Sequence, residues 1–483
     1  PPARAAPRAP DRPRATAPRM LPRAPPRPPA DRPSASPAAD AARARRFAFV
    51  PGAGAPPIPV ARTEGCWLVL ADGRRILDAA GGALGANIGH GRGEVGAAMA
   101  RTLARTDYVV PPFATDERVR LVERLVERWL PAGLTRGLLT SGGSESMDAA
   151  LRLARQHHVA AGRPGRWKMI GRDLSYHGTT LATLAVGGHP KRRRGLEPLL
   201  GAWPKAPACD CLRCPLGLAL PSCAIACVDA IGRGMEAEGP ETGAAVVAEP
   251  VGGSTAGALV PPDGYWPRLA EICRRHGVLL IADEVMTGFG RTGARFAVQH
   301  WGVTPDILVG GKGLAGGYAP MGGVFAREEV IAPLAARGEE FMFYTFGAHP
   351  AACAAAEVVL DVLERERLVE RAAQRGARLL ERLRATLGDH PHVAEIRGKG
   401  LMIGLELVRE RAPLAAFPAA AGFTGRVVAA GLAHGVFVYP AAAGEGRDAV
   451  LLGPPFTIGE DEIELLVGAL ARAIDDAARS APG

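Results

Sequence analysis

The chain has 483 residues, of which 47% are hydrophobic, so it is long enough to bury one large core or two ordinary ones. Its formal net charge of +9 would suggest a nucleic-acid or membrane partner only if that charge were spread over a folded surface. Residues 1–46 contain eleven Arg, three Asp and neither Lys nor Glu, so they carry +8 and leave about +1 for the rest. The near-neutral folded part argues against nucleic acid as a partner.

Residues 1–46 also contain thirteen Pro and many Ala, without hydrophobic periodicity. Such a segment cannot bury enough apolar surface to offset the entropy of ordering it, so we expect it to be disordered. It lacks the continuous apolar core of a secretory signal, and its prolines argue against an amphipathic transit helix. Met20 is a candidate start of the native chain, and a basic arm that contacts an acidic partner is the alternative reading of this tail.

No stretch reaches the roughly 18 consecutive apolar residues that a membrane span requires, so we expect a soluble protein with no membrane partner. Eight cysteines in so long a chain do not make a disulfide scaffold. A reducing cytoplasm is therefore the expected location.

The folded part opens with two short β-like runs in residues 65–80, on either side of an Asp-Gly turn signal. Residues 87–93 are rich in glycine and are expected to form a loop. Helical spacing follows in residues 94–103 and 115–130.

From Leu138 onward, strand-like runs alternate with helical ones. The strand candidates are residues 138–140, 167–171, 244–251, 278–285, 306–311 and 321–326. The helices between them include residues 144–161 and 265–276. This alternation predicts an α/β fold whose large domain is a mostly parallel sheet, covered by helices on both faces.

After Pro350 the pattern changes to a smaller α+β part. It has helices in residues 351–368 and 370–387, strand-like residues 396–408 and an amphipathic helix in residues 460–478. We expect four segments in all: the tail 1–46, an N-terminal part of the small domain 47–95, a large domain 96–345 and a C-terminal small domain 346–483.

The first chemical signal is SGGSES, residues 141–146, which follows an apolar strand and opens a long helix. Its glycines let the backbone approach a ligand, and the free N–H groups of the first helical turn can seat a phosphate. The alternative is a Gly-rich turn in which Ser144 is a plain N-cap. The stretch is neither a P-loop nor a dinucleotide fingerprint.

Polar groups also follow two later predicted strands. Tyr176 and His177 form an aromatic pair at a strand end, where a ring can stack on a flat ligand, although simple packing is the alternative. Glu249 ends an apolar run in which a carboxylate needs a partner, and we predict Arg397 as that partner. A structural salt bridge and a role in substrate gating are both open for this pair.

Asp283 and Lys312 are the strongest candidates for chemistry. Asp283 ends the apolar run LLIAD, and Lys312 stands among glycines just after the next strand. Both are expected beyond the carboxyl ends of strands, where an open α/β sheet presents its ligand face. An acid and a lysine so placed suit an aldehyde cofactor whose two working ends need opposite charges.

The chain resembles the class III aminotransferases of fold type I, which depend on pyridoxal phosphate (PLP). The resemblance rests on the order of seven motifs: SGGSES, SYHG, AEPVGG, ADEVMTGFGRTG, GGKGLAGGYAPMGG, YTFGAHP and RGKGLMIG. It covers roughly residues 60–475 and implies that the large domain, residues 96–345, binds PLP.

The resemblance implies a role for each candidate residue. Lys312 would hold PLP as an internal aldimine and later carry the proton between the substrate carbon and the cofactor. Asp283 would keep the pyridine nitrogen protonated. Other cofactor contacts, to the phosphate and the two ring faces, would come from Gly143, Ser144, Tyr176, His177, Val285 and Thr345.

Two of these implications concern partners and substrates. Thr345 would reach the phosphate of the neighbouring subunit, which implies an obligate homodimer with shared active sites. Glu249 and Arg397 resemble the family's switch pair, in which the arginine binds a substrate carboxylate in one half-reaction and the glutamate neutralises it in the other. At the position of Met286 the ornithine branches typically have a Gln that hydrogen-bonds the cofactor. Because Met cannot make that bond, the chain resembles the ω-amino acid and amine transaminases more than the ornithine branches.

We therefore predict an enzyme that moves an amino group from an ω-amino acid or amine to pyruvate or 2-oxoglutarate. One alternative is another PLP reaction on the same fold, catalysed by a racemase, an aminomutase or a decarboxylase. A second alternative is a binding or regulatory protein of that fold.

Residues 209–227 lie outside the resemblance and hold five of the eight cysteines. Four of them have a C-x2-C-x8-C-x3-C spacing that could close a tetrahedral zinc site. These are Cys211, Cys214, Cys223 and Cys227. We favour the alternative of free thiols, because amino transfer needs no metal.

Overall fold

The computed structural model describes residues 57–110, 113–339, 341, 343–442 and 446–481. The chain divides into two compact units, Pro1–Pro59 and Val60–Gly483, and every helix and strand given below belongs to the second. The predicted tail of residues 1–46, with the candidate start Met20, lies outside the described residues.

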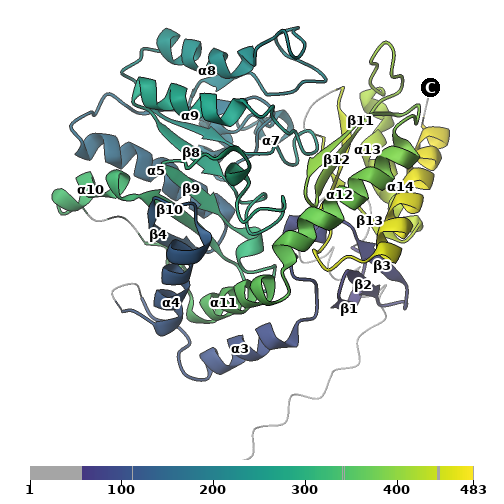
Figure 1. Ribbon diagram of the computed structural model, residues 1–483, viewed down its shortest axis with the longest axis horizontal. Coiled ribbons are helices and arrows are strands. Elements are labelled where there is room, and N and C mark those ends of the chain that lie inside the picture. The colour runs from purple at the N-terminus through teal and green to yellow at the C-terminus, as the bar shows by residue number, and fades with distance from the viewer. Residues whose placement is uncertain (1–56, 111–112, 340, 342, 443–445, 482–483) are drawn as a thin grey trace, which may run out of the picture. The chain divides into compact units, whose positions relative to one another are not determined.

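A seven-stranded sheet forms the largest layer of the second unit (Figure 1). Its spatial order is β4 (Leu134–Thr140), β10 (Gly322–Arg327), β9 (Ile307–Gly310), β8 (Leu279–Asp283), β7 (Gly243–Ala248), β5 (Lys168–Arg172) and β6 (Lys205–Ala206). Only β10 runs antiparallel to its neighbours, and the other pairs are parallel. The predicted mostly parallel sheet is confirmed, and only the two-residue β6 was missed.

Helices cover both faces of this sheet. They are α5 (Gly143–Ala160) and α10 (Glu328–Ala336) on one face, and α8 (Ala226–Ala237) and α9 (Tyr265–His276) on the other. Alternate residues of a strand pack against the helices on opposite faces of the sheet. Val247 and Ile281 pack with α5, whereas Val246 and Leu280 belong to the core that contains α8 and α9. Because both faces are buried, the central strands are apolar throughout, which made them recognisable in the sequence.

Two four-stranded sheets complete the unit, and one joins distant parts of the chain. Its order is β1 (Val60–Glu64), β2 (Trp67–Leu70), β3 (Arg75–Asp78) and β13 (Val436–Phe437). The predicted strands around the Asp-Gly turn are confirmed as β2 and β3. The other sheet has the order β11 (Val393–Lys399), β12 (Met402–Leu407), β15 (Asp448–Leu452) and β14 (Tyr439–Pro440).

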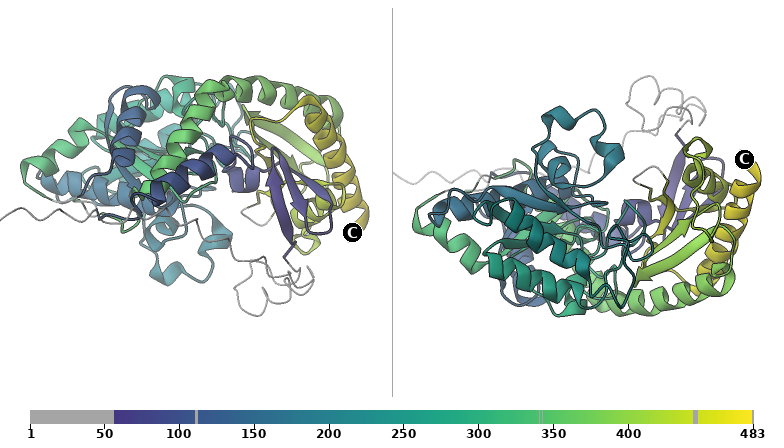
Figure 2. Two further views of the ribbon diagram at one scale, coloured as in Figure 1. Left: turned by 90° about the horizontal axis from the view of Figure 1, so that it is seen from below. Right: turned by 90° about the horizontal axis from the view of Figure 1, so that it is seen from above.

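Long helices pack with these small sheets. They are α12 (Leu368–Leu387), α13 (Phe423–Ala433) and α14 (Glu460–Ser480). Figure 2 shows the purple N-terminal strands beside the yellow α14, where Trp67 Nε1 donates a hydrogen bond to Glu462 at 3.2 Å. The first residues of this unit and its last helix therefore stabilise one another.

The remaining helices are α2 (Gly81–Leu84), α3 (Gly93–Leu103), α4 (Asp116–Arg124), α6 (Leu181–Val186), α7 (Pro190–Arg193) and α11 (Pro350–Arg365). The helix predicted over residues 115–130 is α4 followed by a π-helical turn, Leu125–Trp129. Short 3₁₀ turns lie at Glu197–Leu199, Ala297–Trp301, Lys312–Leu314 and Ala419–Ala421. Among the described residues, no helix is long and apolar enough to cross a membrane.

Candidate active site

A cavity of about 170 Å³ lies beyond the carboxyl ends of the central parallel strands. Each strand contributes a side chain at or just after its last residue, as expected for the ligand face of an open α/β sheet. The cavity is lined by Gly143, Ser144, Tyr176, His177, Gly178, Glu249, Val251, Asp283, Val285, Met286 and Lys312. The structure thus brings together most of the predicted site residues.

Asp283 is the last residue of β8 and is only 5% exposed. One carboxylate oxygen lies 2.7 Å from His177 Nδ1, and the other accepts a hydrogen bond of 3.1 Å from the Val285 N–H. His177 is itself buried, and its Nε2 has no hydrogen-bond partner among the described residues. The imidazole therefore fixes the direction of the Asp283 carboxylate, a role that the sequence did not reveal.

Lys312 follows β9 in a backbone conformation with φ of 40°, which is rare for a residue other than glycine. Strained positions of this kind persist where the surrounding structure imposes them, often at functional sites. Burial lowers the pKa of Lys312 to about 8. At neutral pH, a larger fraction of such a lysine is in the neutral, nucleophilic amine form than is the case for a surface lysine.

Asn87 holds the turn that carries Lys312. Its amide Nδ2 donates to the carbonyls of Gly313 at 2.9 Å and Phe289 at 3.3 Å, and the side chain is 1% exposed. The sequence placed Asn87 in a loop without a role, because its partners lie more than 200 residues away. No local signal marks it as a positioning residue.

The turn between β4 and α5 forms the opposite wall. At Gly143, an added Cβ would come within 2.9 Å of Val285 Cγ1, so only glycine fits there. Gly178 has φ of 141°, and a Cβ there would lie 2.8 Å from Ser144 Oγ. Two separate segments therefore approach closely at a helix N-terminus, which is a suitable seat for a phosphate.

Ser144 does not act as the N-cap of α5. Its hydroxyl instead accepts a hydrogen bond of 3.2 Å from the Thr179 N–H, and the N-cap residue is Gly142. The plain N-cap alternative for Ser144 is therefore wrong. The first N–H groups of α5 receive no side-chain cap, so they are available to a ligand.

Glu249 and Arg397 do not form the predicted ion pair. Glu249, 7% exposed, accepts hydrogen bonds from the Gly253 N–H at 3.1 Å and the Tyr176 N–H at 3.4 Å. Burial raises the pKa of this carboxyl above its usual range. Arg397 instead contacts Glu395 and, at 3.0 Å, Glu406.

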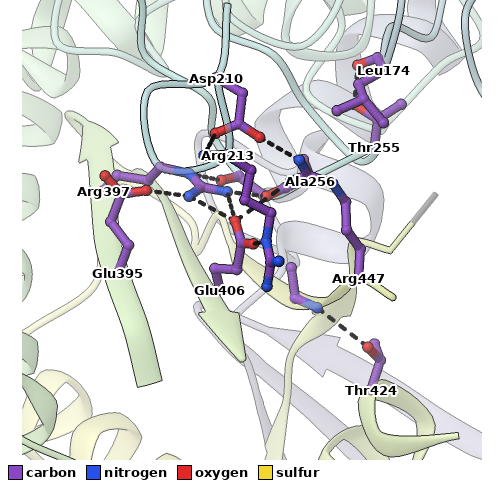
Figure 3. Close-up of polar contacts among 12 residues, drawn as sticks. Leu174, Asp210, Arg213, Thr255, Ala256, Glu395, Arg397, Glu406, Thr424 and Arg447 are labelled. Atoms are coloured by element: carbon purple, nitrogen blue, oxygen red, sulfur yellow. Dashed lines mark hydrogen bonds and ion pairs between the residues drawn. The ribbon is translucent and has the colours of Figure 1, made fainter. Parts of the chain in front are cut away.

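Arg397 belongs to a buried charge network (Figure 3). Its guanidinium also donates to the carbonyls of Gly257, at 2.8 Å, and Ala256. Glu406, 1% exposed, lies at the centre of the network, with Arg213 and Arg447 also pairing to it and Asp210 pairing to Arg447. Arg397 was paired incorrectly from the sequence because Glu406 lies across the β11–β12 hairpin, where register decides which residues meet.

Thr345 is exposed and does not line the cavity of its own chain. Large exposed aromatic side chains surround it in sequence, with Phe343 51% and Phe346 63% exposed. Tyr108 contacts Phe346, with ring centroids 6.2 Å apart, and is 41% exposed. The contribution of Thr345 to a neighbouring subunit stays a prediction.

All eight cysteines are free thiols. Five of them, from the segment 209–227, line one small cavity. Among the described residues, no group of three or more His, Cys, Asp or Glu side chains is placed to hold a metal ion. The zinc alternative for Cys211, Cys214, Cys223 and Cys227 therefore stays a prediction without a preformed ligand set among the described residues.

Comparison with known proteins agrees with this geometry. The aminotransferase class-III family matches residues 49–474. The chain belongs to the class-III aminotransferases. Enzymes of this family transfer amino groups with PLP, and the resemblance inferred from the sequence motifs is confirmed.

Curated relatives and solved structures cover most of this aminotransferase. It is 37% identical to the uncharacterized aminotransferase YhxA of Bacillus subtilis over 84% of this chain and 89% of YhxA. It is 31% identical to a putrescine–pyruvate aminotransferase of Pseudomonas aeruginosa over 87% of this chain and 91% of that protein.

An (S)-enantioselective ω-transaminase of Thermomicrobium roseum has the same fold, with a TM-score of 0.86 and 37% identity over 91% of this chain and 98% of that structure. A PLP-bound amine transaminase from an uncultivated Pseudomonas species has a TM-score of 0.83 and 36% identity, covering 88% and 98% of the two chains. The predicted fold type I is therefore confirmed, and the similarity to these enzymes supports the resemblance to ω-amino acid and amine transaminases.

Proposed function

We propose that this aminotransferase moves an amino group from an ω-amino acid or amine to a 2-oxo acid, pyruvate or 2-oxoglutarate, in a ping-pong reaction. The observation that carries the proposal is the single cavity in which Lys312, Asp283 and the N-terminus of α5 converge. A lysine, an acid and a phosphate seat match the aldehyde, the ring nitrogen and the phosphate of PLP.

The side chains present fit this cofactor. Close approach at Gly143 and Gly178 leaves room where a Cβ would collide. Tyr176 and Val285 both line the cavity and offer an aromatic and an aliphatic surface to a flat ring. When bound, PLP supplies an electron sink for the carbanion formed beside the substrate nitrogen.

Asp283 acts on the ring nitrogen through charge. His177 and the Val285 N–H hold its carboxylate in one orientation. With PLP bound, the Asp283 carboxylate would stabilise a protonated pyridine nitrogen.

Lys312 moves the proton. With PLP and substrate bound, Lys312 Nζ would accept the proton from the substrate carbon that bears the nitrogen and would later return it. The lowered pKa of Lys312, about 8, is close to the operating range of a general base near neutrality. Asn87 holds the turn that carries Lys312 and so helps to position its Nζ.

The proposal includes a homodimer that works in the cytoplasm. The exposed aromatic side chains Tyr108, Phe343 and Phe346 adjoin Thr345, and exposed patches of this kind commonly mark interfaces. A second copy that covers them would bring Thr345 toward its cavity. The free thiols suit a reducing compartment.

We also propose the domain division 47–95, 96–345 and 346–483, with the large sheet in the middle segment. Pairing of β13 with β3 supports a small domain built from both ends of the second unit.

The test is a two-step titration of the purified protein. PLP should bind at one per chain with a visible absorbance that an amine donor removes and pyruvate or 2-oxoglutarate restores. Amine consumed and amino acid formed should be equal in amount. A racemase, aminomutase or decarboxylase would turn over its substrate without any oxo-acid acceptor, and absence of saturable PLP binding would refute the proposal outright.

A further inference from the structure

Helix α7, Pro190–Arg193, places a cation beside the cavity. The guanidinium carbon of Arg192 lies 4.9 Å from the centre of the Tyr176 ring. Tyr176 lines the same cavity as Lys312. Arg192 therefore reaches an aromatic wall of the cavity from outside, as a cation over a ring face.

Arg192 is exposed and, in the part of the chain that the structure describes, forms neither an ion pair nor a side-chain hydrogen bond. Its neighbours are already engaged. Lys191 Nζ donates to the Ala442 carbonyl at 3.4 Å, and Arg193 donates to the carbonyls of Leu184, Ala185 and Gly187. Arg192 keeps its donors available for an anionic ligand.

The electric field of Arg192 extends into the site. Burial is the main cause of the low pKa of Lys312, and the charge of Arg192 acts in the same direction. Burial raises the pKa of Tyr176, and the Arg192 charge opposes that shift. Both effects place the guanidinium within electrostatic range of the cavity.

His189 offers a second polar group at the same wall. Its ring stands edge-on to Tyr176, with centroids 6.3 Å apart, and is 7% exposed. Burial lowers the pKa of His189 to about 4, so the ring is neutral at physiological pH. Its Nδ1 is buried without a hydrogen-bond partner among the described residues, which is costly unless a ligand or water completes it.

Arg397 is not available for the same task. Two glutamates and two backbone carbonyls already accept its hydrogen bonds, and a substrate carboxylate would have to displace them. Removing a partner from a buried ion pair is strongly destabilising, because it leaves a buried charge uncompensated. Arg192 has no ion pair or side-chain hydrogen bond to a described residue that a substrate carboxylate would have to displace.

We propose that Arg192, supported by His189, binds the carboxylate of the 2-oxo acid acceptor at the Tyr176 wall of the cavity. This subsite rests on the proposed transamination and names its acceptor class: an oxo compound with an adjacent carboxylate. The planar guanidinium can accept such a group through two parallel N–H bonds.

The experiment compares two acceptors that differ only in the carboxylate, pyruvate and acetaldehyde, using enzyme that has first reacted with an amine donor. In Arg192→Ala the KM for pyruvate should rise about 10- to 100-fold with little change in kcat, which is the loss of one charged hydrogen-bonding partner. Kinetic constants for acetaldehyde should stay within about threefold of those of the wild type. Arg192→Lys should recover part of the pyruvate affinity.

Lys191→Ala is the matched control, because it removes the same charge from the same helix without touching Tyr176. It should leave the KM for pyruvate unchanged. Inhibition by propionate, an unreactive carboxylate, gives a readout independent of turnover and should weaken in Arg192→Ala alone. Equal losses for pyruvate and acetaldehyde, or an unchanged KM for pyruvate, overturn the subsite. Failure of the wild-type enzyme to aminate pyruvate, 2-oxoglutarate and acetaldehyde alike overturns the proposed function.

Discussion

Two buried regions of this aminotransferase contain acidic and basic side chains, but they differ in how completely those charges are paired with one another. At the ends of the central strands, Lys312 has no hydrogen bond to a described residue. The Asp283 and Glu249 carboxylates are held by backbone N–H groups and, for Asp283, by the His177 imidazole. In the network around Glu406, every described carboxylate faces an arginine (Figure 3). Residue type alone does not distinguish the two regions.

The difference indicates which region is functional. A charge that the protein leaves incompletely paired in a cavity is costly, and it persists where a ligand completes it. A charge whose partners are all present stabilises the local structure and binds nothing further. The cavity is therefore the candidate active site, and the Glu406 network joins the segment 209–227 to the small sheet.

The largest expected effect comes from Lys312→Ala. Loss of the amine that binds the cofactor and moves the proton should lower kcat/KM by about 10⁴-fold or more, without unfolding. The visible absorbance of the PLP-loaded protein should change as well. Steady-state kinetics and circular dichroism measure the two effects.

Lys205→Met is the matched control for that change. Burial lowers the pKa of Lys205 to about 8 also, but its Nζ donates to the carbonyls of Ala185 at 2.6 Å and Trp203 at 3.0 Å. Its loss should affect stability and leave kcat/KM within a few-fold. If both variants lost activity equally, the contrast between unpaired and paired lysines would be wrong.

Glu406→Ala tests the network of paired carboxylates and arginines. Its removal leaves Arg397 and its neighbouring arginines with too few acceptors in a buried setting, at an expected cost of about 3–5 kcal/mol in the free energy of unfolding. Denaturant titration measures this cost. The kcat of the folded fraction should change little, and a selective loss of kcat with normal stability would place the network in the catalytic machinery instead.

Asp283→Asn tests the electrostatic role at the ring nitrogen. Asparagine keeps the shape and the Val285 contact but removes the charge, so kcat should fall about 10²- to 10³-fold. PLP binding should weaken less than kcat falls. Unchanged kcat would show that the protonated ring nitrogen is not required.

Glu284→Gln is the smallest expected effect and concerns stability. Glu284, next to Asp283 but turned away from the cavity lining, is fully buried and accepts a hydrogen bond of 2.8 Å from the Val298 N–H. Burial raises its pKa in the folded protein to about 7, from an ordinary value of 4.5. The folded state therefore holds the proton more tightly, and stability is lost as pH rises from about 4.5 through 7.

Glutamine removes that dependence. Relative to the wild type, Glu284→Gln should gain about 2.5 kcal/mol in unfolding free energy between pH 5 and pH 8. Thermal unfolding at the two pH values measures the gain. A variant whose difference from the wild type does not depend on pH would show that Glu284 is already ionised when buried.

Local patterns predicted much of this enzyme. Continuous apolar runs predicted the central strands because both faces of the sheet are buried. Acids and glycines at the ends of those runs predicted Asp283, Glu249, Gly143 and Lys312 as neighbours, since parallel strands present their carboxyl ends at one edge. The cavity confirms that these side chains meet, and their roles stay predictions.

Pairing across long sequence distances was decided only by the tertiary structure. His177 reaches Asp283 across 106 residues, and Asn87 supports the Lys312 turn across 226. Arg397 has Glu406 as its partner instead of Glu249 because the register of the β11–β12 hairpin, together with the Ala256–Gly257 carbonyls, surrounds it with acceptors. The sequence by itself determined which residue types stand at strand ends, whereas strand order and register decided which charges are satisfied and which remain for a ligand.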